Sequence, residues 1–343
     1  MKCHLVRAVV LAVAGGVMLA ACAGGGAGAR DSALVGHWVR FRHVPGVVDL
    51  AAARGDAWLA VAAGGRLFVL SPSGALRPFA RGAGGYSTAA RGELYITLTG
   101  DARVAGTRCS FHRGMIFALQ PGRRPGIIQV GATGLARRFA VLPAGVMPGG
   151  ITFDFTGHFG HKLLVTARDR TGTTVLGIDC AGGVQAITAH APVMEGGITV
   201  APASFGRYGG DLIAPGETSG RVFAIGPGGM VATLAVSGLP RGGDIGVEST
   251  GFVPSGFTRS DSAFLADRYS RGNKHPGTNS ILRLPGPELI KSGVRPGDLL
   301  VATEAGARTI AIRCTSSCTV RYIAVGPVIT HAEGHIVFAR QSQ

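Results

Sequence analysis

The stretch Met147-Pro148-Gly149-Gly150-Ile151-Thr152 recurs 47 residues later as Met194-Glu195-Gly196-Gly197-Ile198-Thr199. A matching apolar run follows each copy, at residues 174–179 and 221–226, and each run leads into a Gly-Gly turn. Gly243-Asp244-Ile245-Gly246-Val247 opens a third copy at the same distance. The chain therefore contains an internal repeat of about 46 residues.

Shorter copies of the unit flank this repeat. In them, Arg54-Gly55-Asp56 and Arg91-Gly92-Glu93 each form a turn between two apolar runs. The sequence pattern of each unit indicates four short strands joined by tight turns. Four-stranded units that recur every 40–50 residues are the signature of a β-propeller, whose blades pack around one axis. Unit starts near Val47, Gly85, Gly149, Gly196, Gly243 and Pro327 predict an all-β propeller of six blades of four antiparallel strands, with five or seven as alternatives.

The last unit is short, since it ends soon after Phe338. We expect an N-terminal strand near residues 38–43 to complete it, because pairing the two chain ends leaves no open sheet edge. No linker, charge block or second long apolar segment interrupts the chain, so residues 33–343 are predicted to form a single domain.

Two phrases connect the repeat with a known group of propellers. Gly150-Ile151-Thr152-Phe153-Asp154, and Ala266-Asp267 followed by Asn279-Ser280-Ile281-Leu282-Arg283, resemble strand phrases of the NHL and SMP-30/gluconolactonase propellers. The resemblance implies six blades and a Ca²⁺-dependent hydrolase of the lactonase type. Glu195-Gly196-Gly197 is similar to the group's Glu-Gly-Pro phrase, whose glutamate binds the metal. Gly197 replaces the proline, and no asparagine ligands are located.

In such a blade, the loops before the first strand and between the second and third strands lie on one face, at the mouth of the central channel. On this face we expect Glu195 and Asp244 as candidate metal ligands, and Asp267, Arg268 and Lys274 as candidates for ligand contact. Asp169 and Glu217 are predicted on equivalent loops. Converging carboxylates suit Ca²⁺, which takes six to eight oxygen ligands. Alternatively, these residues are solvated turn residues.

The segment His331-Ala332-Glu333-Gly334-His335 has the composition of a metal or acid–base cluster. Its Glu-Gly pair aligns with the turns at residues 54–55 and 91–92, which predicts a hairpin with the histidines on different strands. A structural role is favoured over a site. No common nucleophile, zinc-protease or phosphate-loop motif occurs in the chain.

The N-terminus is typical of an exported protein. Lys2 and Arg7 precede an apolar run from Ala8 to Ala21, which is too short to span a bilayer and has the length of a signal-peptide core. Leu19-Ala20-Ala21-Cys22 resembles the lipobox of bacterial lipoproteins, which implies a signal peptide at 1–21, a lipid on Cys22 and a Gly/Ala-rich tether at 22–32. The alternative is an ordinary signal peptide cleaved nearby.

The remaining cysteines fit an oxidising compartment. Cys314 and Cys318 lie at either end of a short loop between two strand-like runs, so we predict a disulfide there. Half of a zinc site is the alternative, although no second ligand pair is visible. Cys109 is placed before a third strand and Cys180 after one in the next blade, which puts them toward opposite faces; their pairing stays open.

The formal net charge is +15, but the arginines are scattered, which argues against nucleic-acid binding and for a general attraction to an anionic envelope surface. Two functions remain. The first is a membrane-anchored binding or scaffold propeller, on the outer face of the cell membrane or the periplasmic side of an envelope membrane, with a protein or glycan ligand. The second is a Ca²⁺-dependent hydrolase. A fold alone does not decide between them.

Overall fold

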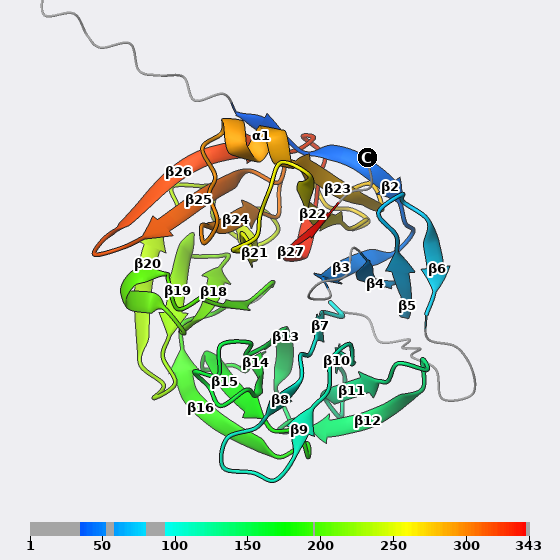
Figure 1. Cartoon of the computed structure of the whole chain (residues 1–343), viewed down its shortest axis with the longest axis vertical. Coiled ribbons are helices and arrows are strands. Elements are labelled where there is room, and N and C mark those ends of the chain that lie inside the picture. The colour runs from blue at the N-terminus through cyan, green and yellow to red at the C-terminus, as the bar shows by residue number, and fades with distance from the viewer. Residues whose placement is uncertain (1–34, 53–57, 80–92, 195, 341–343) are drawn as a thin grey trace, which may run out of the picture. The chain divides into compact units, whose positions relative to one another are not determined.

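The computed structural model describes residues 35–52, 58–79, 93–194 and 196–340. In these ranges six sheets of four or five strands stand around one axis, and a two-stranded hairpin is added at the edge (Figure 1). The predicted six-bladed β-propeller is thereby confirmed. Residues Ala33–Gln343 form one compact unit.

Blades 1 to 4 each use four strands in chain order, with the first strand nearest the axis. Blade 1 consists of β3 (Val47–Ala52), β4 (Leu59–Ala63), β5 (Arg66–Leu70) and β6 (Leu76–Pro78). Blade 2 consists of β7 (Ile96–Leu98), β10 (Ile116–Gln120), β11 (Gly126–Val130) and β12 (Ala136–Val141). Blade 3 consists of β13 (Met147–Phe153), β14 (Leu163–Arg168), β15 (Thr173–Ile178) and β16 (Val184–Ala191). Blade 4 consists of β17 (Thr199–Val200), β18 (Leu212–Gly216), β19 (Arg221–Ile225) and β20 (Val231–Val236), with a 3-10 turn at Gly206–Tyr208.

Blades 5 and 6 exchange strands. Blade 5 begins with β21 (Val247–Phe252), but the chain then leaves it to form β22 (Asp261–Asp267) and β23 (Ser280–Pro285) of blade 6. It returns through helix α1 (Gly286–Lys291) to add β24 (Leu299–Thr303), β25 (Thr309–Cys314) and β26 (Cys318–Val325) to blade 5. The last strand, β27 (Ala332–Arg340), becomes the inner strand of blade 6.

The chain ends meet in blade 6, as predicted. Strand β2 (Val39–His43) is its outer strand and pairs with β23, while β27 pairs with β22. The two middle strands, however, come from the exchange and not from the short terminal unit. A further strand, β1 (Gly36–His37), pairs in parallel with the end of β26 in blade 5.

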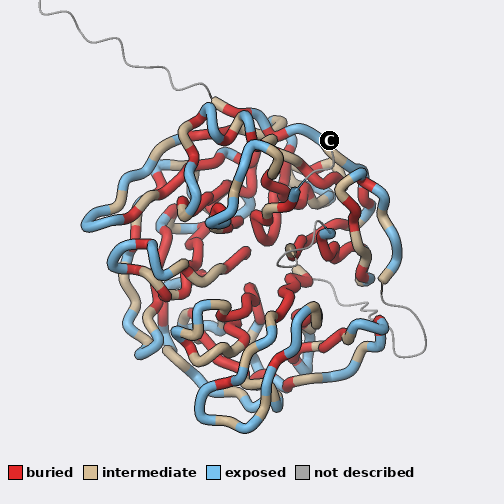
Figure 2. Tube along the Cα trace, in the orientation of Figure 1, coloured by how far each residue is buried: buried red, intermediate tan, exposed pale blue. Residues whose placement is uncertain are grey.

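The strands are apolar on both faces because every blade packs between two others. Along β22, Ala263 and Leu265 pack against blade 5, whereas Phe264 and Ala266 pack against blade 1. Side chains alternate along a strand, so one strand serves two cores. Figure 2 shows buried strands around the axis and exposed outer strands and turns. No helix in the described ranges is long and apolar enough to cross a membrane.

The disulfide Cys314–Cys318 is present, as predicted, at the turn between β25 and β26. Cys109 and Cys180 also pair, so their placement toward opposite faces was wrong. The reason is a hairpin, β8 (Ala102–Arg103) and β9 (Ser110–Phe111), inserted between the first and second strands of blade 2. Cys109 therefore precedes a second strand, and its loop shares a face with the loop after β15 that carries Cys180. The predicted blade start at Gly85 lies outside the described residues.

Candidate functional site

Ionisable side chains fill the axis at the end where the first strands begin. They come from blades 2, 5 and 6, and we call them the axial cluster: Glu93, Tyr95, Glu248, Arg268, Glu304, His331 and Glu333. Each acidic member lies at or near the end of an apolar strand, so strand packing brings the carboxylates out of water. Buried carboxylates require partners, because an isolated charge in the interior is costly.

Tyr95, from blade 2, and Arg268, from blade 6, supply partners to these carboxylates. The Tyr95 hydroxyl lies 2.8 Å from Glu248 Oε1 and 2.6 Å from Glu333 Oε2. Arg268 Nη1 lies 2.9 Å from Glu93 Oε1 and 2.8 Å from Glu333 Oε1. The side chains of Arg268 and Glu93 are 25% and 35% exposed, whereas that of Glu333 is 2% exposed. Arg268 and Glu93 thus form the solvent-facing rim of the cluster.

His331 ties the cluster to blade 5. Its Nε2 lies 2.8 Å from Glu304 Oε1 and 3.4 Å from Glu333 Oε1. Burial opposes the charged imidazolium, but hydrogen bonds to Glu304 and Glu333 outweigh it and raise the pKa of His331 to about 10. At neutral pH the ring is therefore a cation that donates to Glu304.

The same balance fixes the other charges of the cluster. Burial disfavours the Glu333 carboxylate, but His331 and Arg268 prevail and lower its pKa. Burial also opposes the Arg268 guanidinium, but Glu333 and Glu93 raise its pKa further. Burial, together with Glu248, raises the pKa of Tyr95 well above its ordinary value. Tyr95 therefore stays a neutral hydrogen-bond donor between carboxylates.

Next to the cluster, main chains of different blades come into contact across the axis. A Cβ on Gly197, in blade 4, would lie 2.1 Å from the carbonyl oxygen of Gly334, in blade 6. Gly197 N–H also donates to the carbonyl of Glu248 at 3.0 Å. Blades 4 and 6 are not neighbours in the ring, so their contact narrows the central channel. Only glycine allows this approach.

The cluster offers donors to a metal ion, but its cationic position is already filled. Glu93, Glu248 and Glu333 each place one oxygen within 4.8 Å of the others, and Glu304, His331 and Glu333 do the same with their ligand atoms. Carboxylate oxygens suit Ca²⁺. Arg268 Nη1, however, contacts two of the three carboxylates, and His331 Nε2 is occupied with Glu304. The residues in this arrangement do not fit a bound Ca²⁺.

A cavity of about 1000 Å³ opens at the opposite end of the axis. The ends of the first strands and the loops after them line it, so its wall is largely apolar. Phe155, Phe252, Phe257 and Phe338 contribute aromatic rings, and His335 belongs to the lining. Asp261 and Arg340, 3.9 Å apart, also line it and supply charge. We call this space the axial cavity.

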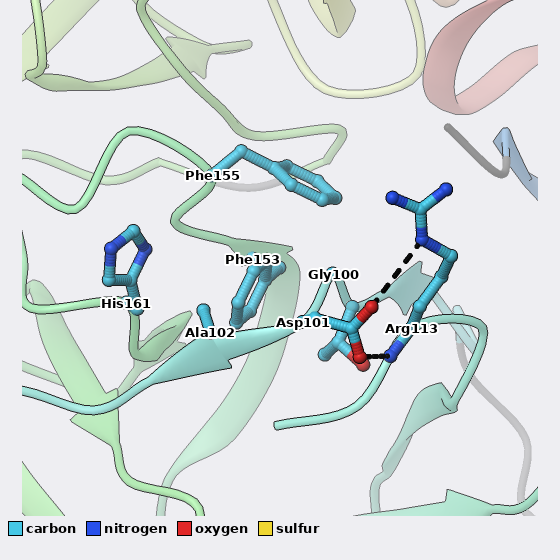
Figure 3. Close-up of a pocket in the computed structure, with 8 residues that line it drawn as sticks. Gly100, Asp101, Ala102, Arg113, Phe153, Phe155 and His161 are labelled. Carbon is cyan, nitrogen blue, oxygen red and sulfur yellow. Dashed lines mark hydrogen bonds and ion pairs between the residues drawn. The ribbon is translucent and has the colours of Figure 1, made fainter. Parts of the chain in front are cut away.

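A smaller cavity of about 110 Å³ lies beside it between blades 2 and 3 (Figure 3). Phe155 lines both cavities. Asp101 and Arg113 face each other on its wall, with Arg113 Nε 3.7 Å from the Asp101 carboxylate. Both of these side chains are about two-thirds exposed, so their pair contributes little to stability.

The residues predicted on the channel-mouth face lie in different environments. Arg268 is a cluster member, and Asp267 is fully buried, where it accepts hydrogen bonds from Thr278 and from the His331 backbone N–H. Asp244 and Lys274 are exposed and belong to no cluster of the described residues. Glu195, the other metal candidate, and Cys22 lie outside the described residues.

Of the equivalent loop residues, Glu217 is buried and Asp169 is exposed. The hairpin predicted at 331–335 was wrong. Glu333 and His335 both lie on β27, and His331 directly precedes that strand. All three join buried charge networks.

Five residues of the buried charge networks were not predicted from the sequence: Asp49, Glu93, Tyr95, Glu248 and Glu304. A usable signal existed, because Asp49, Glu248 and Glu304 are single acids inside or beside apolar strand runs. Acidic residues are almost never fully buried without a partner, so a lone acid within a core strand marks a buried network.

No family model and no curated protein sequence matches the chain. Among solved structures, it is similar to a streptogramin B lyase, with 11% identity, a TM-score of 0.46, and coverage of 83% of this chain and 72% of that one. A putative TolB from Agrobacterium tumefaciens is 11% identical, with a TM-score of 0.46 and coverage of 87% and 91%. A putative gluconolactonase is 9% identical, with a TM-score of 0.46 and coverage of 84% and 94%. At these values no conclusion about the site follows from them.

Proposed function

We propose that the protein is an exported lipoprotein, held to the outer face of a cell membrane by a lipid on Cys22, whose propeller binds an amphipathic ligand in the axial cavity. The observation that supports the binding function is the cavity itself. Its volume of about 1000 Å³ is at the upper end of the range of ligand sites, and such sites are mostly apolar with a few polar groups.

The lining favours an apolar or aromatic body with a polar end. Phe252, Phe257 and Phe338 offer ring surface to the body, while Asp261 and Arg340 offer charge to the polar end. The axial cluster and the close approach of Gly197 to Gly334 occupy the other end of the axis, so a ligand enters from the cavity side. The protein or glycan partner expected from the sequence remains a prediction.

The binding function is tested with the fluorescent probe 1-anilinonaphthalene-8-sulfonate, an aromatic body with one anionic group. We expect one binding site per chain. Thr199→Trp fills the cavity, because Thr199 lines it, and should weaken binding at least tenfold; Thr319→Trp, on the exposed outer strand β26, should leave it unchanged. Equal binding by both variants, with unchanged melting temperatures, contradicts the proposal.

The anchor is tested separately. Labelled palmitate should enter the wild-type protein in its own cells, and Cys22→Ser should abolish the label. Labelling that survives in Cys22→Ser overturns the anchor without touching the binding function.

A Ca²⁺-dependent hydrolase is the second candidate, and one observation favours it: the convergence of Glu93, Glu248 and Glu333. The position of Arg268 among these carboxylates opposes it. Divalent metal retained by the purified full chain, and lost in Glu248→Gln or Glu195→Gln, would establish this alternative. We expect no retained metal.

A further inference from the structure

Two loops on the cluster side of blade 6 present apolar and basic side chains together to solvent. We call this surface the tip patch: Tyr269, Arg271, Lys274, Val328 and Ile329. Val328 is 80% exposed, Tyr269 51% and Ile329 44%, and both basic residues are exposed. Exposed aliphatic and aromatic side chains that gather on one surface mark an interaction site.

Two main-chain hydrogen bonds and one side-chain contact hold the two loops against each other. Gly277 N–H donates to the carbonyl of Ile329 at 2.8 Å, and His275 Nδ1 lies 2.8 Å from the carbonyl oxygen of Val328. Arg268 N–H donates to the carbonyl of His331 at 2.9 Å. The apolar tips are therefore held in place before a partner binds, so binding costs no entropy for ordering these loops.

We propose that the tip patch docks on an anionic lipid surface, with Val328, Ile329 and Tyr269 entering the interface and Arg271 and Lys274 contacting the headgroups. Aliphatic and aromatic tips beside basic residues have the chemistry of interfacial membrane binding, in which apolar burial and attraction to anionic lipid add together. The excess of basic residues, +15 for the chain, acts in the same direction.

The start of the described chain lies next to this patch. Gly36 and His37 pair with Ala324 and Val325, and the 326–331 loop that carries Val328 begins at the following residue. Cys22 lies 13 residues before Val35, so chain length keeps it within roughly 45 Å of this point. A lipid on Cys22 and the tip patch would thus reach one bilayer together. This orientation rests on the proposed anchor, whereas the affinity of the patch for lipid does not.

Docking in this orientation turns the axial cavity away from the membrane. The tip patch lies on the face formed by the loops before first strands, and the cavity opens on the other face. The anchored propeller would then present its cavity to the surrounding medium.

The test uses the mature chain, residues 22–343, with Cys22→Ser, so that neither a lipid nor the apolar run at 8–21 contributes. Vesicles of phosphatidylglycerol and phosphatidylcholine are compared with vesicles of phosphatidylcholine alone. We expect binding to the anionic vesicles only. Val328→Asp should weaken it about tenfold, and Arg271→Glu and Lys274→Glu about fivefold each. Met230→Asp is the matched control, because Met230 is 79% exposed at a turn on the opposite face. It should bind as the parent does.

A second measurement reads the orientation directly. Tryptophan introduced as Val328→Trp should be quenched by brominated phosphatidylglycerol vesicles, while Met230→Trp should not be. Trp38 is buried and Trp58 half-exposed, so the parent chain supplies the background. Equal loss of binding in the Val328 and Met230 variants, or quenching at Met230 instead of Val328, overturns the proposal. Probe binding in the axial cavity should be the same in these variants as in the parent, which keeps this test separate from the proposed function.

Discussion

The carboxylate of Asp49 holds His335 at two points. Its Oδ1 accepts the His335 backbone N–H at 2.7 Å, and the ring Nδ1 lies 2.9 Å from Oδ2. Oδ2 also accepts the backbone N–H of Ile96 at 2.7 Å. One side chain of blade 1 therefore joins the inner strands of both neighbouring blades. Burial opposes the charged His335 ring, but Asp49 raises its pKa.

Asp49→Asn keeps the shape of this side chain and removes its charge. Breaking a buried pair leaves the other charge uncompensated, so we expect the free energy of unfolding to fall by about 3 kcal/mol in urea titrations. Asp101→Asn breaks an exposed pair and should cost less than about 1 kcal/mol. Similar losses of unfolding free energy in the two variants would show that the Asp49 charge does not stabilise the propeller.

Arg268→Ala removes the cation from among Glu93 and Glu333. We expect the variant to be destabilised by about 3 kcal/mol because Glu93 and Glu333 each lose a cationic partner. We also expect it to gain a divalent cation site, so that Ca²⁺ raises its melting temperature while the wild-type value stays unchanged. Arg113→Ala serves as the control. A Ca²⁺ response in the wild type would show that Arg268 does not take the cation's place.

His331 gives stability a pH dependence. Its folded pKa of about 10 lies above the value of 6.5 for the free side chain, so the native state binds the proton more tightly than the unfolded state. The stabilisation is complete below pH 6.5 and is lost as pH rises through about 10. Urea titrations of the wild type between pH 7 and pH 10 should show this decline, and His331→Gln should show a shallower one, because His335 also has a raised pKa and contributes its own. Parallel pH profiles would contradict the assignment.

The two disulfides should differ in their effect on stability. Cys109–Cys180 spans 71 residues and Cys314–Cys318 spans four. Closing a longer loop removes more entropy from the unfolded chain, which gives about 4 kcal/mol for the first and about 2 kcal/mol for the second. Paired serine substitutions, compared by thermal unfolding, measure both. A larger loss for the short loop would reverse this order.

The blades were predictable because each strand carries its own local pattern. The repeat at Gly149 and Gly196 located blades 3 and 4, and the Cys314–Cys318 turn was correct. The exchange between blades 5 and 6 was not predictable, since β22 and β23 have the pattern of second and third strands whichever inner strand they join. Only the long-range pairing of β27 with β22 decides it.

The axial cluster escaped prediction for a related reason. Its members come from three blades, and no short motif contains more than one of the carboxylates. The prediction treated Glu333 as a turn residue because its Glu-Gly pair resembles the turns of other units. In the structure Gly334 instead serves the close approach of β27 to Asp49, where a Cβ would lie 2.1 Å from Oδ1.

Because of the strand exchange, blades 5 and 6 can only evolve and fold together. A cut between β21 and β27 leaves both blades unfinished, so neither can be deleted, duplicated or permuted alone, as a blade of an ordinary propeller can. A chain that emerges from its N-terminus must also wait for its last strand, β27, before blade 6 can have its inner edge. The ring therefore closes only after β27 has been made.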